Sequence, residues 1–233
     1  MHSYSQGDEL VDPPKVSVII PTMNEEASIG LVIEEVIKAL GPIPHEILVI
    51  DTDSKDKTRE VAAAKGAVVV DEPRKGYGRA YKTGFEKASG EIIATLDADM
   101  TYPASMIPQL ITLLENRELD FVTTNRFAMM HKGAMGAKHR FGNWVLSATT
   151  RTLFRVKLKD SQSGMWVFRR AILKDLVLES DAMSLSEELK IEAFKKKRAV
   201  EVPIEYRVRV GEVKLSSWRD GLGNLKYLFR KRF

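Results

Sequence analysis

The chain has 233 residues, of which 44% are hydrophobic, and this is enough to bury the core of one sizeable domain. It contains no cysteine, which excludes a disulfide scaffold and a cysteine-based zinc site and favours a reducing compartment. The formal net charge of +4 suits an anionic ligand such as a nucleotide, a phosphate or an anionic membrane surface.

Residues 1–15 are predicted to form a flexible lead that ends at Pro13 and Pro14. The lead is polar and contains acids, which is typical of neither a signal peptide nor a transit peptide. No stretch of the sequence approaches the roughly 18 uninterrupted apolar residues that cross a bilayer. We therefore expect a cytoplasmic protein.

Apolar runs alternate with helical patterns over the first half of the chain. Strands are predicted at residues 16–20, 46–50, 67–70, 91–96 and 120–123. Helices are predicted between them, at 29–40, around 61–63, from 75 to 88 and at 106–114. Pro21 is expected to end the first strand, and Asn24 to cap the helix after it. At least four alternations indicate an α/β fold with a mostly parallel central sheet flanked by helices.

After Arg126 this alternation breaks. Residues 127–140 are rich in Met, Gly and basic residues and are predicted to form a mobile flap. Helical spacing resumes from Trp144 to Phe154, a strand is predicted at 165–168, and helices are predicted near 170–179 and 186–197. A further strand at 199–202 is expected to end at Pro203. Residues 216–233 form a basic amphipathic tail, which either contacts a membrane or packs on the body of the protein.

Asp97, Ala98 and Asp99 follow the apolar strand at 91–96. The carboxyl ends of parallel strands meet at the edge of the sheet where ligands bind. Two such close carboxylates repel each other unless a cation or solvent separates them. A divalent metal that also holds phosphate oxygens satisfies both acids, and the alternative is a solvated acidic turn.

Other strand ends carry polar residues too: Asn24 and Glu25, Asp51 and Asp53, and Arg126. Acids or an arginine at four strand ends favour one shared site. Asp51 suits a nucleobase or ribose contact, or alternatively a helix N-cap ahead of Lys55.

Phosphate groups have several candidate partners. Arg126 and Arg140 suit forked contacts with phosphate, and so do three basic residues near the C-terminus, Arg207, Arg209 and Lys214. Lys75–Gly78 at a helix start is a weaker candidate for a phosphate cradle. The four histidines have no useful spacing and no general base stands out. An acceptor that is a phosphate monoester needs no base, because it is already ionised near neutral pH.

Motifs in a fixed order carry a family resemblance: PTMNE, IDTDSKDKT, KGYGRAYKTG, DADMTYP, TTNRF, DSQSGM, EVPI and GEVKL. From about Val16 to Leu215 the chain resembles glycosyltransferase family 2 enzymes with the Rossmann-like GT-A fold, and most closely the dolichyl-phosphate and polyprenyl-phosphate mannosyl- and glucosyltransferases. The resemblance implies a GT-A domain at residues 16–215, followed by the tail at 216–233.

The resemblance also assigns site residues. It implies a nucleotide pocket lined by Pro21, Met23, Glu25, Val49 and Asp51. It places Asp97 and Asp99 on the metal and the diphosphate, with Ala98 beside the nucleotide. It implies catalytic roles for Asp99, Arg126 and Arg140, and a loop carrying Arg207, Arg209 and Lys214 that closes over the diphosphate.

Some positions depart from the family pattern. Thr101 stands where a metal-contacting glutamine is common, and we include it with the metal residues. Met23 replaces an aromatic residue, Thr52 an acid, and Val213 a serine. The first three changes fall near the base and the metal, so the choice between guanine and uracil donors stays open.

The expected reaction is an inverting hexose transfer to dolichyl or polyprenyl phosphate, assisted by Mg²⁺ or Mn²⁺. The expected donor is GDP-mannose, and the alternatives are UDP-glucose or UDP-N-acetylglucosamine. The other hypotheses are an enzyme with a non-lipid acceptor and a nonenzymatic basic module that binds nucleic acid or membrane. We expect no nucleic-acid partner. We expect peripheral contact with the cytoplasmic face of a membrane through the tail, with a membrane-anchored subunit or an oligomer as further partners.

Overall fold

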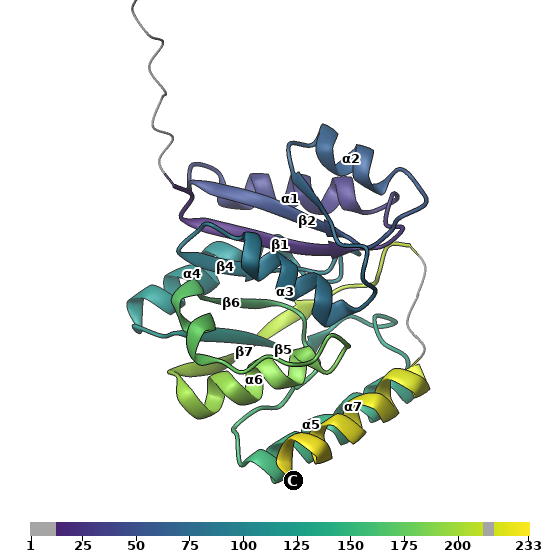
Figure 1. The fold of residues 1–233 in the computed structure, drawn as a ribbon, viewed down its shortest axis with the longest axis vertical. Helices are drawn as coiled ribbons and strands as arrows, with labels where there is room; N and C mark the ends of the chain where they lie inside the picture. Colours follow the sequence, from purple (N-terminus) through teal and green to yellow (C-terminus); the bar gives the residue numbers. More distant parts are fainter. Residues whose placement is uncertain (1–12, 212–216) are drawn as a thin grey trace, which may run out of the picture.

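The computed structural model describes residues 13–211 and 217–233, so most of the predicted lead lies outside it (Figure 1). A seven-stranded sheet, in the order β3-β2-β1-β4-β6-β5-β7, forms its centre. The strands are β1 (Val16–Thr22), β2 (His45–Asp51), β3 (Val68–Asp71), β4 (Ile92–Thr95), β5 (Phe121–Met130), β6 (Trp166–Arg169) and β7 (Ala199–Tyr206). The α-helices are α1 (Ile29–Leu40), α2 (Thr58–Ala64), α3 (Tyr77–Lys87), α4 (Ile107–Asn116), α5 (Ala137–Phe154), α6 (Leu185–Lys196) and α7 (Ser217–Arg232).

The sheet is mostly parallel, as the sequence predicts. Strand β1 lies parallel to both β2 and β4, and β2 lies parallel to β3. Strand β6 is inserted antiparallel between β4 and β5, and β7 lies parallel to β5 at the edge. Two reversals in succession leave β5 pointing in the same direction as β4. The carboxyl ends of β1, β2, β4 and β5 therefore face the same edge of the sheet.

Helices cover both faces of this sheet (Figure 1). One core cluster joins the inner residues of β1, β2 and β4 to the apolar sides of α1 and α4. The other cluster packs α3 and α6 against the opposite face, with the buried rings of Tyr81, Trp166 and Phe168. Burial of apolar area contributes about 25 cal/mol per Å², so these two layers stabilise the sheet from both faces.

Two prolines lie inside strands that they were expected to end. Strand β1 includes Pro21, and β7 continues past Pro203 to Tyr206. Pairing of β1 with β4 extends only to Ile19, so Pro21 lacks a neighbour on that side. Pro203 lies on an edge strand beside a register shift of β5. In both places the missing N–H breaks no ladder hydrogen bond.

Three local predictions were wrong. Much of the predicted flap is regular structure, because β5 runs to Met130 and α5 begins at Ala137. The helix predicted near 170–179 is a short 3₁₀ segment, η2 (Arg170–Asp175); a second 3₁₀ segment, η1 (Ala104–Met106), precedes α4. Asn24 does not cap α1; its side-chain oxygen accepts a hydrogen bond from the backbone N–H of Lys55.

The C-terminal helix α7 runs alongside α5 (Figure 1). Its Leu228 is fully buried in a cluster with Leu146 and Phe154 of α5. The Tyr227 hydroxyl donates a hydrogen bond to Glu188 of α6. One side of α7 therefore packs on the body, as one of the two interpretations of its sequence predicts, while Leu222 and Phe229 stay exposed. None of the helices in residues 13–211 and 217–233 combines the length and apolar character needed to cross a membrane.

Candidate active site

The acidic pair lies in the turn that follows β4. Asp99 is buried, and its Oδ1 accepts hydrogen bonds from the backbone N–H (3.0 Å) and the hydroxyl (2.6 Å) of Thr101. Its Oδ2 accepts from Arg209 Nε at 2.8 Å. Met100 has a φ of 65°, a left-handed conformation that lets the chain turn sharply enough for these contacts. Thr101 of the turn thus holds one oxygen of the Asp99 carboxylate, and Arg209, from the segment after β7, holds the other.

Asp97 is different, because its carboxylate has no hydrogen bond within the described part of the chain. Burial, together with the negative charge of Asp99, raises the pKa of Asp97 to about 7. Gly164 leaves room beside it, since a Cβ added there would lie 3.1 Å from Asp97 Oδ1. An unpaired carboxylate beside a second acid favours a bound cation.

Oxygen donors of this kind fit a hard divalent ion such as Mg²⁺ or Mn²⁺, which Asp97 and Asp99 would hold. No group of three or more metal-binding side chains occurs in the described ranges. Two carboxylates with phosphate oxygens completing the shell are a common arrangement for Mg²⁺. The Thr101 hydroxyl is directed at Asp99, and its role as a metal ligand stays a prediction.

Arg126 is buried in β5, where it forms a two-point ion pair with Asp160. The distances are 2.8 Å from Nε to Oδ2 and 2.9 Å from Nη2 to Oδ1. The guanidinium also lies over the ring of Tyr206, 5.3 Å from its centre. Burial by itself raises the pKa of Asp160, but the charge and hydrogen bonds of Arg126 more than offset this and lower it. The guanidinium is therefore fixed in orientation before any ligand binds.

Lys190 of α6 fastens the turn that carries Asp160. Its Nζ donates to the carbonyl oxygens of Asp160 at 3.0 Å and Ser163 at 2.7 Å. Asp160 and Lys190 were not among the predicted site residues. For Asp160 a signal was available, because it opens the DSQSGM motif, whereas a lysine within a helical pattern gives no such signal.

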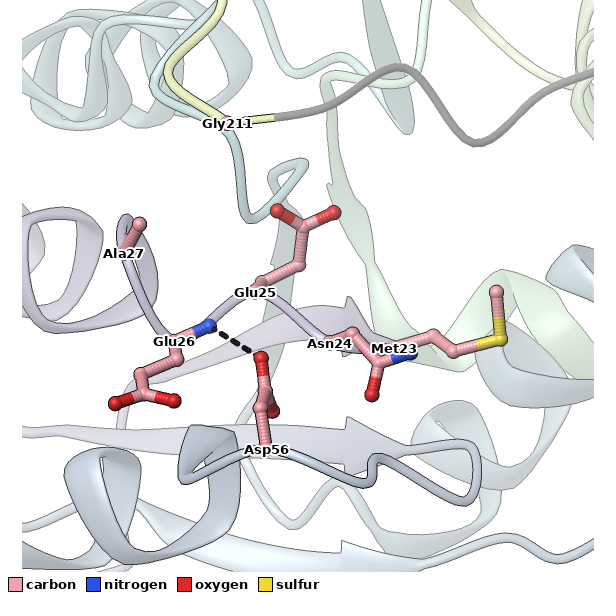
Figure 2. A pocket seen from close by; sticks show the side chains of 7 residues that line it. All are labelled: Met23, Asn24, Glu25, Glu26, Ala27, Asp56 and Gly211. Carbon is pink, nitrogen blue, oxygen red and sulfur yellow. Dashed lines mark hydrogen bonds between the residues drawn. The ribbon is translucent and has the colours of Figure 1, made fainter.

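An open pocket of about 700 Å³ lies beside the loop between β1 and α1 (Figure 2). Glu25 points across it toward Gly211, where an added Cβ would lie 3.6 Å from Glu25 Oε2. The predicted nucleotide residues Met23 and Glu25 both line this pocket, together with Asn24, Glu26, Ala27, Asp56 and Gly211.

Asp51, at the end of β2, is fully buried, and its carboxylate already has partners within the protein. Its carboxylate accepts hydrogen bonds from the Thr22 hydroxyl at 3.0 Å and the Ser54 backbone N–H at 3.1 Å, and it pairs with Arg59. These contacts give Asp51 a structural role in the turn after β2. It is not the helix N-cap raised as the alternative, because α2 begins at Thr58 and Lys57 holds the N-cap position. A nucleotide contact by Asp51 stays a prediction.

Several predicted residues do not present a side chain at the acidic pair. Val49 and Ala98 are buried in the core, which leaves their side chains no ligand surface, and Pro21 lies within β1. Arg207 pairs with Glu35 and Glu205, away from the acids. Arg140 is exposed on the first turn of α5, and its guanidinium has no ion pair in the described ranges. Lys214 lies outside the described residues.

The candidate phosphate cradle at Lys75–Gly78 is closed. The carbonyl of Asp181 accepts the Arg79 backbone N–H at 3.1 Å, and a Cβ on Gly76 would lie 2.3 Å from that same oxygen. The helix start is thus covered by protein backbone, and the proposal of a phosphate site there is wrong.

Known proteins are similar to this chain in sequence and in fold. The model of the family "Glycosyl transferase family 2" matches residues 17–177. A low-salt glycan biosynthesis hexosyltransferase, Agl6, from Haloferax volcanii is 34% identical over 97% of this chain and 57% of its own length. A dolichyl-phosphate hexose transferase from the same organism is 32% identical, over 88% of this chain and 89% of the relative.

A dolichol-phosphate mannosyltransferase from Pyrococcus furiosus is 31% identical over 86% of this chain and 59% of its own length. The chain thus spans less than two thirds of two of these three relatives. Among solved structures, a glucosyl-3-phosphoglycerate synthase from Mycobacterium tuberculosis superposes with a TM-score of 0.77 at 23% identity, over 94% of this chain and 80% of that one. This likeness confirms the predicted GT-A fold. The matched residues and the identity to these relatives together show that the chain belongs to glycosyl transferase family 2.

Proposed function

We propose that the protein transfers a hexose from a nucleotide-diphosphate sugar to the phosphate of dolichyl or polyprenyl phosphate, with inversion at the anomeric carbon. The observation that carries this is the juxtaposition of two centres on one sheet edge. The acidic pair Asp97 and Asp99 follows β4, the buried Arg126 lies on β5, and the positive charge of Arg126 acts on Asp97. One centre suits a cation-bound diphosphate, and the other suits the phosphate of an acceptor.

The transfer needs no general base from the protein. An oxygen of the acceptor phosphate attacks the anomeric carbon, and the bond from that carbon to the diphosphate oxygen breaks. The nucleoside diphosphate leaves, and no proton has to be removed because the attacking phosphate is already ionised. A divalent cation at Asp97 and Asp99 would offset the charge on the departing diphosphate.

Within this reaction Arg126 binds and orients. Asp160 holds the Nε and Nη2 edge of the Arg126 guanidinium, and the ring of Tyr206 lies over one face. The 8% of the side chain that stays exposed is proposed to meet the ligand. A guanidinium in a site with little water stabilises phosphate charge more strongly than one in solvent. Arg140, exposed on α5, and Lys214 remain proposed phosphate contacts.

The names of the relatives support the acceptor class. Two of them are described as acting on dolichyl or dolichol phosphate, and a third as a dodecaprenyl-phosphate galacturonate synthase, 29% identical over 70% of this chain. The solved relatives were crystallised with UDP and Mn²⁺ or Mg²⁺, which supports a divalent cation. We propose GDP-mannose as the donor, with UDP-glucose as the alternative.

We also propose that α5 and α7 together contact the cytoplasmic face of a membrane. Phe141 and Trp144 of α5 are 66% and 56% exposed, and their rings stack 6.1 Å apart. Phe229 and Leu222 of α7 are exposed as well. Exposed basic residues accompany them: Lys138, Arg140, Lys226, Arg230 and Arg232. Aromatic and basic side chains on one helical layer favour an anionic membrane surface.

A donor screen tests the proposal. Purified protein is given GDP-mannose, UDP-glucose or UDP-N-acetylglucosamine, with polyprenyl phosphate and Mg²⁺ or Mn²⁺. Parallel reactions replace the lipid with free hexose or phosphoglycerate. Transfer to the lipid with one donor supports the proposal, whereas transfer confined to the non-lipid acceptors rejects it.

A further inference from the structure

Arg209 pairs with Asp99, one of the two acids that follow β4. Its Nε and Nη2 both contact Asp99 Oδ2, at 2.8 Å and 2.7 Å, and Nη2 lies 3.9 Å from Glu25 Oε1. The other carboxylate oxygen of Asp99 is taken by Thr101. Both oxygens of Asp99 are therefore in use, although this acid is expected to bind a metal.

The backbone around Arg209 aims the side chain at this position. The backbone N–H of Arg207 donates to the carbonyl of Thr101 at 2.9 Å, and that of Val210 donates to the carbonyl of Asp99 at 2.9 Å. The segment is thus fastened on either side of Arg209 to the turn that carries the acid. Arg207, two residues earlier, pairs instead with Glu35 and Glu205.

The negative charges around Asp99 explain why a positive group is stable beside it. Asp99 and Glu25 both lie within reach of Arg209, and the negative charges of both act on Asp97. Like charges near one another are costly when partly removed from water. Asp99 is held at 6% side-chain exposure and Glu25 at 8%, while Arg209 remains 24% exposed and so has a path to solvent. The guanidinium and a divalent ion are both positive, and they cannot share one carboxylate oxygen without strong repulsion.

We propose that Arg209 is the resident counter-ion of Asp99, and that it leaves this carboxylate when a divalent cation binds together with a nucleoside diphosphate. The inference rests on the proposed function and adds an order of events to it. A cation alone has to break a charge-assisted hydrogen bond and leaves Arg209 without that partner. A cation that arrives with a diphosphate offers the released guanidinium a new anionic partner.

Two consequences follow for binding. The metal alone binds weakly, and the diphosphate strengthens metal binding by coupling through Arg209. By reciprocity the metal strengthens diphosphate binding by the same factor. Removing the Arg209 guanidinium is therefore expected to tighten binding of the metal alone. It is also expected to weaken the coupling between metal binding and diphosphate binding.

The test measures Mn²⁺ binding to the full chain from the electron paramagnetic resonance signal of free Mn²⁺. Arg209→Met removes the charge and the donors while keeping a similar length, and Arg207→Met is the matched control. Without nucleotide, Arg209→Met is expected to bind Mn²⁺ about tenfold more tightly than the wild type, and Arg207→Met equally to it. Adding GDP or UDP is expected to tighten Mn²⁺ binding in the wild type and much less in Arg209→Met.

A second readout follows the segment itself. The chain has no cysteine, so Val208→Cys takes a single nitroxide label, and Val208 is 54% exposed. Label mobility is expected to change on adding Mg²⁺ with the nucleoside diphosphate, and not on adding Mg²⁺ alone at the same concentration.

The outcomes separate the inference from the proposed function. If Arg209→Met binds Mn²⁺ no more tightly than the wild type, while Asp99→Asn abolishes binding, the inference is wrong and the metal site stands. If no variant binds Mn²⁺ even with either nucleotide, the proposed function fails and the inference with it.

Discussion

Arg126 and Asp160 form a buried two-point ion pair, and the backbone N–H of Arg126 donates to the same carboxylate at 3.1 Å. The pair joins β5 to the turn that precedes β6, and that turn is fastened by Lys190. The Nε and Nη2 edge of the guanidinium is thus bound to the protein. In the proposed function, these contacts would orient the exposed part of the guanidinium toward the acceptor phosphate before it binds.

Asp160→Asn removes the charge of this pair while keeping its shape. Leaving a buried guanidinium uncompensated is expected to lower the free energy of unfolding by about 3 kcal/mol. Misplacing Arg126 is expected to lower kcat about a hundredfold. Denaturant unfolding and transfer assays measure the two effects, and calorimetry should find the nucleotide Kd unchanged. A variant with wild-type kcat would show that the pair does not position Arg126 for the reaction.

The raised pKa of the buried Glu187 carboxyl makes the stability of the protein depend on pH. Burial raises its pKa to about 8 from the ordinary value of 4.5, even though Gln162 donates a hydrogen bond to it. Between these two values the folded protein keeps a proton that the unfolded chain has released. The free energy of unfolding therefore falls as the pH rises through this window.

Glu187→Gln stays neutral at every pH and keeps an oxygen for Gln162. We expect it to unfold at a higher denaturant concentration than the wild type at pH 9, with the difference shrinking toward pH 5. Equal pH dependence of the two proteins, measured by urea titration, would show that Glu187 does not keep its proton in the fold.

Packing of α7 is tested by two neighbouring side chains. Leu228 is fully buried and Phe229 is 47% exposed. Leu228→Ala is expected to cost about 2–5 kcal/mol of stability, because it opens a cavity against α5. Phe229→Ala is expected to change stability by at most about 0.5 kcal/mol. Thermal unfolding of both variants measures the difference. If Leu228→Ala costs as little stability as Phe229→Ala, α7 does not pack on α5 as described.

Membrane contact predicts that exposed aromatic residues of α5 matter for vesicle binding. Phe141→Ser combined with Trp144→Ser is expected to reduce flotation with anionic vesicles at low salt, without loss of stability. Salt should weaken wild-type binding, because the basic residues act through a screened charge. Val68→Ser is a control on β3, since the exposure of Val68, 54%, is close to the 56% of Trp144. Absence of wild-type flotation at low salt would reject the membrane surface.

Much of the fold was predictable where local pattern and tertiary environment agree. The runs that became β1, β2 and β4 are buried on both faces, so they appear as continuous apolar segments. Their polar ends were located correctly, because parallel strands of one sheet end at one edge. The antiparallel insertion of β6 follows an 18-residue helix, α5, and no local signal indicates its direction.

The site was predicted less completely, for reasons that particular residues illustrate. Asp97 and Asp99 are recognisable from two acids after an apolar strand. Asp160 is recognisable as a partner of Arg126 only once β5 and the turn before β6 are adjacent in space. The pattern of α7 is the same for a membrane-bound helix and for one packed on protein. The burial of Leu228 against α5 shows that the side of α7 that carries Leu228 packs on protein.

The most direct test of the central claim is hexose transfer to polyprenyl phosphate by the wild type and Asp99→Asn, with Mg²⁺ or Mn²⁺ and the donor identified by the screen. The substitution keeps the shape of the turn but removes a charge from the proposed cation site. We predict that the wild type makes the lipid-linked sugar only with the cation present, and that Asp99→Asn loses at least about a hundredfold in rate. Transfer by Asp99→Asn at the wild-type rate would contradict the assignment of the acidic pair as the centre that binds the departing diphosphate.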